Sequence, residues 1–190
     1  MRMLLLLLFS TFVSAQAQMS NDPGAGPNAR AQAAADVIRD VARSDVAFLA
    51  AGLLKSTDPG GDLSAYMQYP TDEIVVVKLS GSEIKEAIER SVSSYPDSSS
   101  AFLQISGMTV RFNPKGASGS RVLEIKINDS ALEASRVYTV AMPESLARGA
   151  LGYFRIWDRA KISSNTSVKL ETALAGKTNT VRQPRYFVSQ

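Results

Sequence analysis

The clearest hydrophobic pattern begins with an apolar, β-branched run at residues 74–77, which is typical of a strand buried on both faces. Ser80 and Glu83 then have the spacing of a capping box at the start of a helix. Glu86 and Arg90 stand four apart on its outer face, in the order that favours an ion pair. The apolar residues that follow at helical spacing are Ile84, Ala87, Ile88 and Val92. This stretch therefore predicts a buried strand, a tight turn and an amphipathic helix.

The same periodicities predict the other elements of the chain. Early in the chain helices and strands alternate, and later the strands cluster, so the predicted fold class is α/β (α+β), a mixed sheet with flanking helices. In chain order these elements are a helix at 31–41, strands at 45–52, 102–105, 108–112, 122–127 and 136–142, a helix start after Pro143, a helix at 166–174, and a strand or extended tail at 181–188.

Residues 1–18 have the pattern of a secretory signal peptide. Arg2 supplies the positive start, residues 4–13 the apolar core, and residues 13–15 or 15–17 a small-residue cleavage site. The apolar core is far shorter than the roughly 20 residues of a membrane-spanning helix. We therefore expect export, with no membrane span.

Composition limits the remaining possibilities. The sequence has no cysteine, so we expect neither disulfides nor a lipid-attachment site, and a periplasmic or secreted location. Its formal charge of +3 comes from mixed charges rather than a basic stripe, which argues against a nucleic-acid partner. Residues 19–29 are rich in Pro, Gly and Asn and predict a flexible leader, and residues 30–190 predict a single domain.

The sequence also contains no histidine. Together with the lack of cysteine, this excludes Ser-His-Asp and Cys-His catalysis and the usual zinc sites. Asp36 and Asp40, one helical turn apart, are interpreted as solvated charges rather than a magnesium site. Ser82 and Lys85 form an S-x-x-K pattern, which is interpreted as a helix start with a surface lysine. We expect no catalytic residue, no metal site and no cofactor.

Five segments in order carry a family resemblance: VVVKLSGSEIKEAIERSV, FLQISGMTVRFNP, GSRVLEIKIND, RVYTVAMPESL and GALGYF. Together they resemble the C-terminal domain of the 5'-nucleotidase family, over residues 33–174. The resemblance implies a nucleotide-binding domain, normally preceded by a metallophosphatase domain that holds the metals. Only residues 19–29 lie between the predicted signal and this domain, so we expect the metallophosphatase domain to be missing.

In the family a loop of the form N-[AG]-G-G-[IV]-R contributes an asparagine and an arginine to the substrate. The matching residues here are 50–55, with Ala50 at the asparagine, Leu53 at a glycine and Lys55 at the arginine. A lysine keeps the charge but loses the bidentate fork of arginine. The resemblance therefore implies a weakened anion site at Lys55.

The family also sandwiches the base between two aromatic rings and holds the ribose with an aspartate. The matching positions here are Ile74, after the segment Tyr69-Pro70-Thr71, then Ser145, and Leu151 within GALGY. An early N-x-G-N helix motif is replaced around residues 29–32. We therefore expect a retained scaffold with a degenerate site, so that binding of a nucleotide or nucleoside is in doubt.

The remaining candidate contacts for a substrate are Lys55, Ser145, Arg148 and Tyr153. One interpretation places Tyr153 and Trp157 in a repurposed pocket for another ligand, and the favoured one packs them into the core. The predicted function is an exported domain, non-catalytic by itself, that acts as a binding or partner module. The alternative is the substrate-binding half of a split 5'-nucleotidase that works with a separate metallophosphatase chain. Whether the chain takes part in an enzyme is therefore left open.

Overall fold

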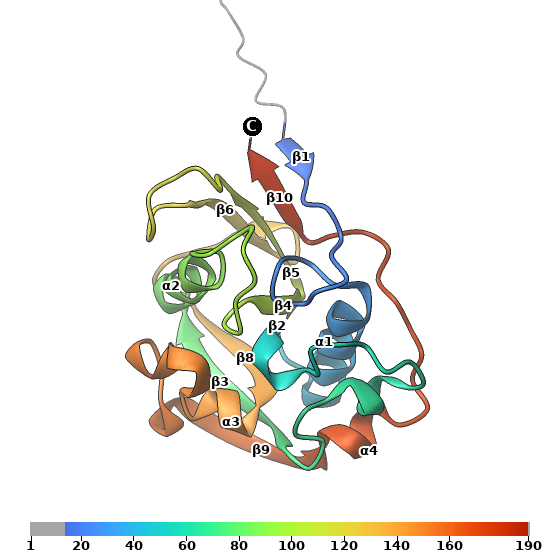
Figure 1. Cartoon of the computed structure of the whole chain (residues 1–190). Coiled ribbons are helices and arrows are strands. Elements are labelled where there is room, and N and C mark those ends of the chain that lie inside the picture. The colour runs from blue at the N-terminus through green and yellow to red at the C-terminus, as the bar shows by residue number, and fades with distance from the viewer. Residues whose placement is uncertain (1–13, 190) are drawn as a thin grey trace, which may run out of the picture.

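The structure is a computed structural model that describes residues 14–189. Two five-stranded sheets form the framework, in the orders β4-β2-β8-β3-β9 and β1-β10-β5-β6-β7 (Figure 1). The strands of the first sheet are β4 (Leu103–Ser106), β2 (Val46–Ala50), β8 (Val137–Pro143), β3 (Glu73–Ser80) and β9 (Ile162–Lys169). Those of the second are β1 (Ser14–Gln16), β10 (Tyr186–Ser189), β5 (Met108–Phe112), β6 (Val122–Ile127) and β7 (Ser130–Ala131).

Helices flank both sheets. Helix α1 packs on β2, β4 and β8, whereas α2 contacts β3 of one sheet and β6 of the other (Figure 1). β2 and β8 are parallel, as are β10 and β5, and the other pairs are antiparallel, which confirms the predicted mixed α/β class. The helical elements are α1 (Ala29–Ala42), η1 (Ala51–Leu53), η2 (Leu63–Tyr66), α2 (Gly81–Ser91), α3 (Glu144–Ala147), η3 (Ala150–Arg155), η4 (Arg159–Lys161) and α4 (Leu170–Leu174).

The central unit β3–α2 follows the prediction closely. The apolar run at residues 74–77 is at most 7% exposed, as expected for a strand covered on both faces. The Glu83 amide donates to the Ser80 hydroxyl at 3.3 Å, and the Ser80 amide donates to the Glu83 carboxylate at 2.8 Å. This capping box is therefore confirmed. Arg90, by contrast, donates to the Leu151 carbonyl rather than pairing with Glu86.

Gly107 is the corner at which the chain passes from the first sheet to the second. It separates β4 from β5 and has a φ of 76°, a conformation that side chains other than glycine rarely adopt. A Cβ atom at this position would collide with the carbonyl oxygen of Asp45. The predicted break between two strands is thus confirmed, and glycine is required there for two separate reasons.

The helix predicted at residues 166–174 is wrong for its first part. Residues Ile162–Lys169 form the edge strand β9, and the helix begins only at Leu170. Side chains of β9 bond to the neighbouring strand: the Thr166 hydroxyl donates to the Ile74 carbonyl at 2.7 Å and the Ser163 hydroxyl to the Val76 carbonyl at 3.1 Å. Pairing with the exposed edge of β3 therefore overrides the local helical pattern.

The segment before α1, for which the sequence predicts a flexible leader, makes specific contacts with the domain. The buried Gln104 amide donates to the carbonyls of Pro23 and Gly26, both at 2.8 Å, and its oxygen accepts from the Asn28 amide at 2.9 Å. The Asn28 side chain in turn caps α1, accepting from Arg30 and Ala31. Among residues 14–189, no helix combines the length and apolar character that crossing a bilayer requires.

Candidate functional site

Three loop segments meet at one end of the first sheet. The amides of Ala51 and Gly52, just after β2, donate to the carbonyls of Phe102 and Ser100 at 2.8 and 2.9 Å. Gly52 also lies against Leu151 of η3, so closely that an added Cβ would touch the leucine side chain. The structure thus brings the loop of residues 50–55 and the 149–155 segment together, as the family resemblance implies.

Helix α3 carries two of the predicted site residues. The backbone amide of Ser145 donates to the Asp72 carboxylate at 3.1 Å, which ties α3 to the loop before β3. The Ser145 hydroxyl is buried and has no hydrogen-bond partner among the described residues. Arg148 is exposed and pairs with Glu144 at 2.6 Å, and this contact raises the pKa of the arginine. Ser145 and Arg148 therefore face different surroundings, although they lie on one short helix.

Tyr153 lies in the core. Its ring is 0% exposed and stacks on Trp157, with centroids 4.6 Å apart and an angle of 12° between the planes. Its hydroxyl donates to the Ala101 carbonyl at 2.6 Å, and burial raises its pKa well above the ordinary value. Arg90 lies over the same ring at 5.3 Å. Core packing of the two rings is thus confirmed. Tyr153 was predicted as a substrate contact, but its ring is fully enclosed and has no face open to a ligand.

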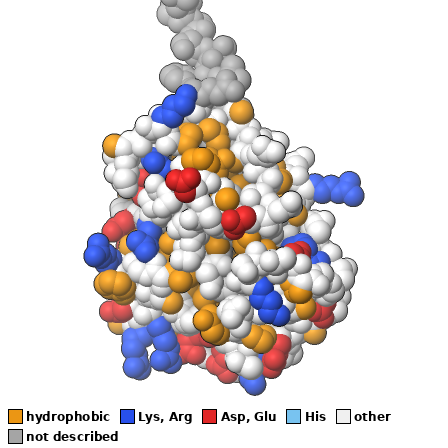
Figure 2. All heavy atoms as spheres, in the orientation of Figure 1, with side chains coloured by type: hydrophobic (Ala, Val, Ile, Leu, Met, Phe, Trp, Pro, Cys, Tyr) orange, Lys and Arg blue, Asp and Glu red, His pale blue; other side chains and the backbone are white. Residues whose placement is uncertain are grey.

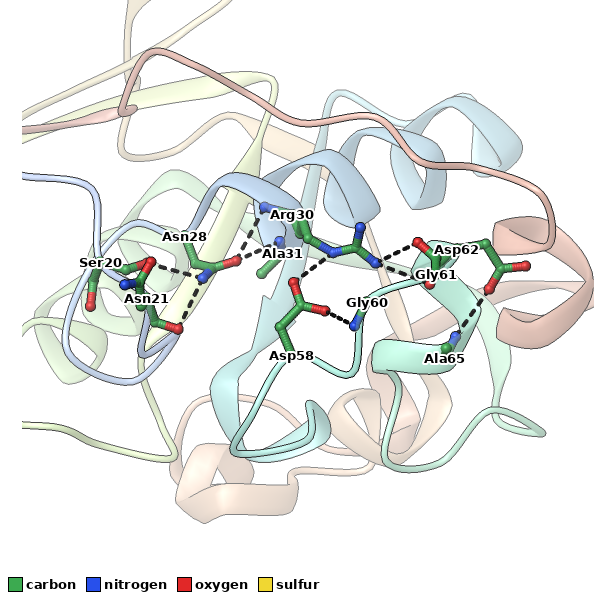
Figure 3. A network of polar contacts seen from close by, with 10 residues as sticks. All are labelled: Ser20, Asn21, Asn28, Arg30, Ala31, Asp58, Gly60, Gly61, Asp62 and Ala65. Carbon is green, nitrogen blue, oxygen red and sulfur yellow. Dashed lines mark hydrogen bonds and ion pairs between the residues drawn. The ribbon is translucent and has the colours of Figure 1, made fainter.

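Lys55 is exposed and begins a loop that a second basic residue, Arg30, holds in place (Figure 3). The guanidinium of Arg30, from the first turn of α1, approaches the Asp58 carboxylate at 2.7 Å. It also donates to the carbonyls of Gly61 and Asp62 at 3.0 and 3.1 Å. These contacts use the Arg30 guanidinium inside the protein, whereas the Lys55 side chain is exposed.

Two further groups fix the loop that follows Lys55. The Asp62 carboxylate accepts from the hydroxyl of Ser64 at 2.7 Å and from the amide of Gly176 at 2.8 Å, and these bonds lower its pKa. Tyr66 is fully buried behind the loop, and burial, with Asp58 second, raises its pKa to about 12. Asp62 and Tyr66 therefore anchor the far end of the loop that begins at Lys55.

Apolar side chains fill several positions where the resemblance implies contacts with a nucleotide. Ala50 and Ile74 are both 0% exposed, and Leu151 is half-buried against Gly52. The exposed aromatic rings lie elsewhere, at Tyr69 and Phe154, which are 54% and 64% exposed. Neither an aromatic sandwich nor a carboxylate for the ribose is therefore present at the matching positions.

Within the described part of the chain, no group of three or more acidic residues lies close enough to hold a metal ion. Asp36 pairs with Arg185 at 2.7 Å and accepts from the Ser106 hydroxyl at 2.5 Å, so its interpretation as a solvated charge is wrong. Asp40 remains near Arg39 at 3.6 Å. Over the face drawn in Figure 2, basic and acidic side chains are interspersed rather than gathered into one stripe.

Three residues that organise this region were not among the predicted site residues: Arg30, Asp72 and Arg90. Each acts on a residue far away in the sequence, such as Leu151 for Arg90, 61 positions away, and Ser145 for Asp72, 73 positions away. No local pattern marks such contacts, because the helical spacing of Arg90 indicates only a neighbour one turn away.

The two mixed sheets and their flanking helices define a mixed α/β domain of the kind found in solved 5'-nucleotidases. A family model described as "5'-nucleotidase, C-terminal domain" matches residues 13–158, and the chain therefore belongs to this family. The solved 5'-nucleotidase precursor of Thermus thermophilus superposes with a TM-score of 0.77 at 20% identity, over 95% of this chain and 40% of that one.

Among curated relatives, the 5'-nucleotidase-related protein of Glossina morsitans morsitans is 29% identical over 139 residues, which is 66% of this chain and 25% of the relative. The human 5'-nucleotidase is 33% identical over 91 residues, 44% of this chain and 16% of the relative. The chain thus spans a quarter or less of the length of these relatives, and the similarity covers their C-terminal domain.

Proposed function

We propose that this chain is an exported domain of 5'-nucleotidase C-terminal type that is non-catalytic by itself and acts as a binding or partner module. The observation that carries the proposal is the burial of Ala50 and Ile74, both 0% exposed, where the family resemblance implies an asparagine and an aromatic ring. The lack of histidine in the sequence supports the non-catalytic part. The signal-like residues 1–18 support export, although all but five of them lie outside the described residues.

The energetic argument compares the lost contacts with the affinity of an ordinary site. A base that loses its aromatic stacking gives up about 1–3 kcal/mol. Each lost charge-assisted hydrogen bond removes about 1.5–3 kcal/mol. A micromolar site has only about 8 kcal/mol of binding free energy, so these losses together leave no useful nucleotide affinity.

The test is a calorimetric and thermal-shift titration of the purified chain with AMP and adenosine, alongside a phosphate-release assay. We expect no saturable binding and no phosphate release. Lys55→Ala removes the exposed charge at the loop, and Lys85→Ala, an exposed lysine on α2, is the matched control. AMP binding that is lost in Lys55→Ala and kept in Lys85→Ala would contradict the degenerate-site argument.

The alternative function is the substrate-binding half of a split 5'-nucleotidase. It is favoured by Lys55, which keeps a positive, exposed group at the anion position, and by relatives that are far longer than this chain. Under this hypothesis, adding a separately expressed metallophosphatase domain produces phosphate release from AMP, and Lys55→Ala reduces it. Equal release with and without this chain would rule the alternative out.

A further inference from the structure

A polar cavity lies at the corner between the two sheets, away from the loop of residues 50–55. β4 runs antiparallel to β2, so its last residue, Ser106, lies opposite Ala47 near the start of β2. Gly107 follows Ser106, whereas the loop of residues 50–55 follows the other end of β2. The cavity has a volume of about 550 Å³, which is within the range of small-molecule sites. It is therefore a separate candidate site at the opposite end of this strand pair.

Several parts of the chain meet around this cavity. Thr109 of β5 and Lys126 of β6 are register partners, so their side chains stand on the same face of the second sheet. The amide of Asn128, in the turn after β6, donates to the Gly107 carbonyl at 3.3 Å. The segment between α4 and β10 runs beside α1 (Figure 1), where the Val181 amide donates to the Ala29 carbonyl at 2.9 Å. The polar side chains that these parts contribute to the lining include Arg39, Asp40, Thr109, Lys126, Asp129 and Asn179.

One ion pair in the lining is already satisfied within the protein. Arg185 donates to both oxygens of Asp36 at 2.7 Å, and the Ser106 hydroxyl donates to the same carboxylate at 2.5 Å. Arg185 also donates to the carbonyl of Ile105. These two charges therefore form a fixed part of the wall rather than a place for a ligand.

The other charges of the lining are held only by long contacts. The side chain of Arg39 is 32% exposed, and among residues 14–189 its ion-pair partner is Asp40, at 3.6 Å. Lys126 approaches Glu124 at 3.8 Å. Both distances exceed that of a hydrogen bond, so donors of these cations remain available. A Cβ on Gly107 would lie 2.9 Å from the Arg39 guanidinium, and this glycine therefore lets the guanidinium rest against the corner.

The balance of these charges indicates the kind of ligand. A charge that is largely removed from water is costly unless it is paired, as Arg39 is only loosely. Asp40 and Asp129 contribute carboxylates to the same cavity, so a ligand of a single sign would also meet like charges there. Within the described part of the chain no aromatic ring lines the cavity, which leaves no surface for stacking a base. A small ligand that carries both a carboxylate and an ammonium group satisfies both signs.

We propose that this cavity binds a small zwitterion, a free amino acid or a short peptide. Its carboxylate binds Arg39 and Lys126, because a guanidinium and an ammonium group are strong donors to a carboxylate. Its ammonium group binds Asp40 and Asp129. The inference does not rest on the proposed function, which concerns the other end of the first sheet.

The experiment is an NMR titration of the purified, isotope-labelled chain with L-alanine and with L-alanyl-L-alanine. Propionate and ethylamine are the matched probes, because each keeps one of the two charges. We expect saturable shifts of the backbone amides of Gly107, Thr109 and Asn128 with a zwitterion. Propionate and ethylamine should bind at least about tenfold more weakly, since each lacks one charge-assisted contact. The tighter of the two zwitterions shows whether the ligand is an amino acid or a peptide.

Three variants test the assignment of the charges. Arg39→Gln and Asp129→Asn should each weaken zwitterion binding by about tenfold or more, whereas Lys85→Gln, on the exposed side of α2, should leave it unchanged. Asp129 has a φ of 64°, which asparagine also tolerates, so Asp129→Asn keeps the test valid if Arg39→Gln fails to fold.

Three results would overturn the proposal. They are the lack of any shift in these amides at up to about 10 mM zwitterion, equal binding of propionate and L-alanine, and unchanged binding by a folded Arg39→Gln or Asp129→Asn variant. AMP-dependent shifts in the loop of residues 50–55 would contradict the proposed function alone. The position of the shifted amides therefore shows which of the two has failed.

Discussion

The glycine at the corner between the two sheets offers the most direct test of the structure. Gly107 has a φ of 76°, and its Cβ would collide with the Asp45 carbonyl, whereas Gly60 has a φ of 74° with no atom within 4 Å of its Cβ. Replacing either by alanine places a side chain in the left-handed region, which costs about 1–2 kcal/mol. Only Gly107→Ala adds a steric clash with backbone, and overpacking of this kind costs about 1–3 kcal/mol more.

We therefore expect Gly60→Ala to lower the free energy of unfolding by about 1–2 kcal/mol and Gly107→Ala by about 2–5 kcal/mol. Urea denaturation, followed by circular dichroism and by the fluorescence of Trp157, measures both values on the same chain. Coincident transitions from the two probes are the control for two-state behaviour. Equal losses in the two variants would refute the close approach of Gly107 to Asp45 and thus the proposed corner.

Three further predictions concern the polar contacts. Burial raises the pKa of Glu83, but bonds to Lys161 and to the helix start outweigh it, so its pKa lies below the ordinary 4.5. At low pH the unfolded chain then binds more protons than the folded one, so the stabilisation that Glu83 contributes is lost as the pH falls below about 4. When the free energy of unfolding is measured across acid pH, Glu83→Gln should therefore lose less stability than the unmodified chain. Tyr153→Phe removes a buried hydrogen bond and should cost about 1–3 kcal/mol in urea denaturation, with no change in AMP titrations. Gln104→Ala leaves backbone groups of residues 23–28 without partners, and limited proteolysis should cut that segment faster while the core stays intact; unchanged cutting would contradict its role as an anchor.

The family resemblance implied which segments contribute to the site but not how their side chains lie. The loop of residues 50–55 and the 149–155 segment were matched through the family pattern, and the structure places them in contact through Gly52 and Leu151. The burial of Tyr153 depends on Ala101, 52 positions away, and on stacking with Trp157. Local spacing left two orientations open for these rings, and only long-range packing selects one.

The sequence by itself determined the elements whose signals are local. The apolar run at residues 74–77, the capping box of Ser80 and Glu83, and the glycine break at Gly107 each act within a few residues, so the strand, the helix start and the corner follow from them. The mixed α/β class follows from the order of such elements.

Only the tertiary structure decided the rest. Residues 166–169 form a strand because the edge of β3 offers backbone partners that an isolated segment lacks. The segment before α1 packs on the domain because Gln104, 81 positions from Pro23, supplies its hydrogen bonds. Both outcomes depend on groups that folding alone brings together, and a buried backbone group must find a partner wherever in the chain it lies.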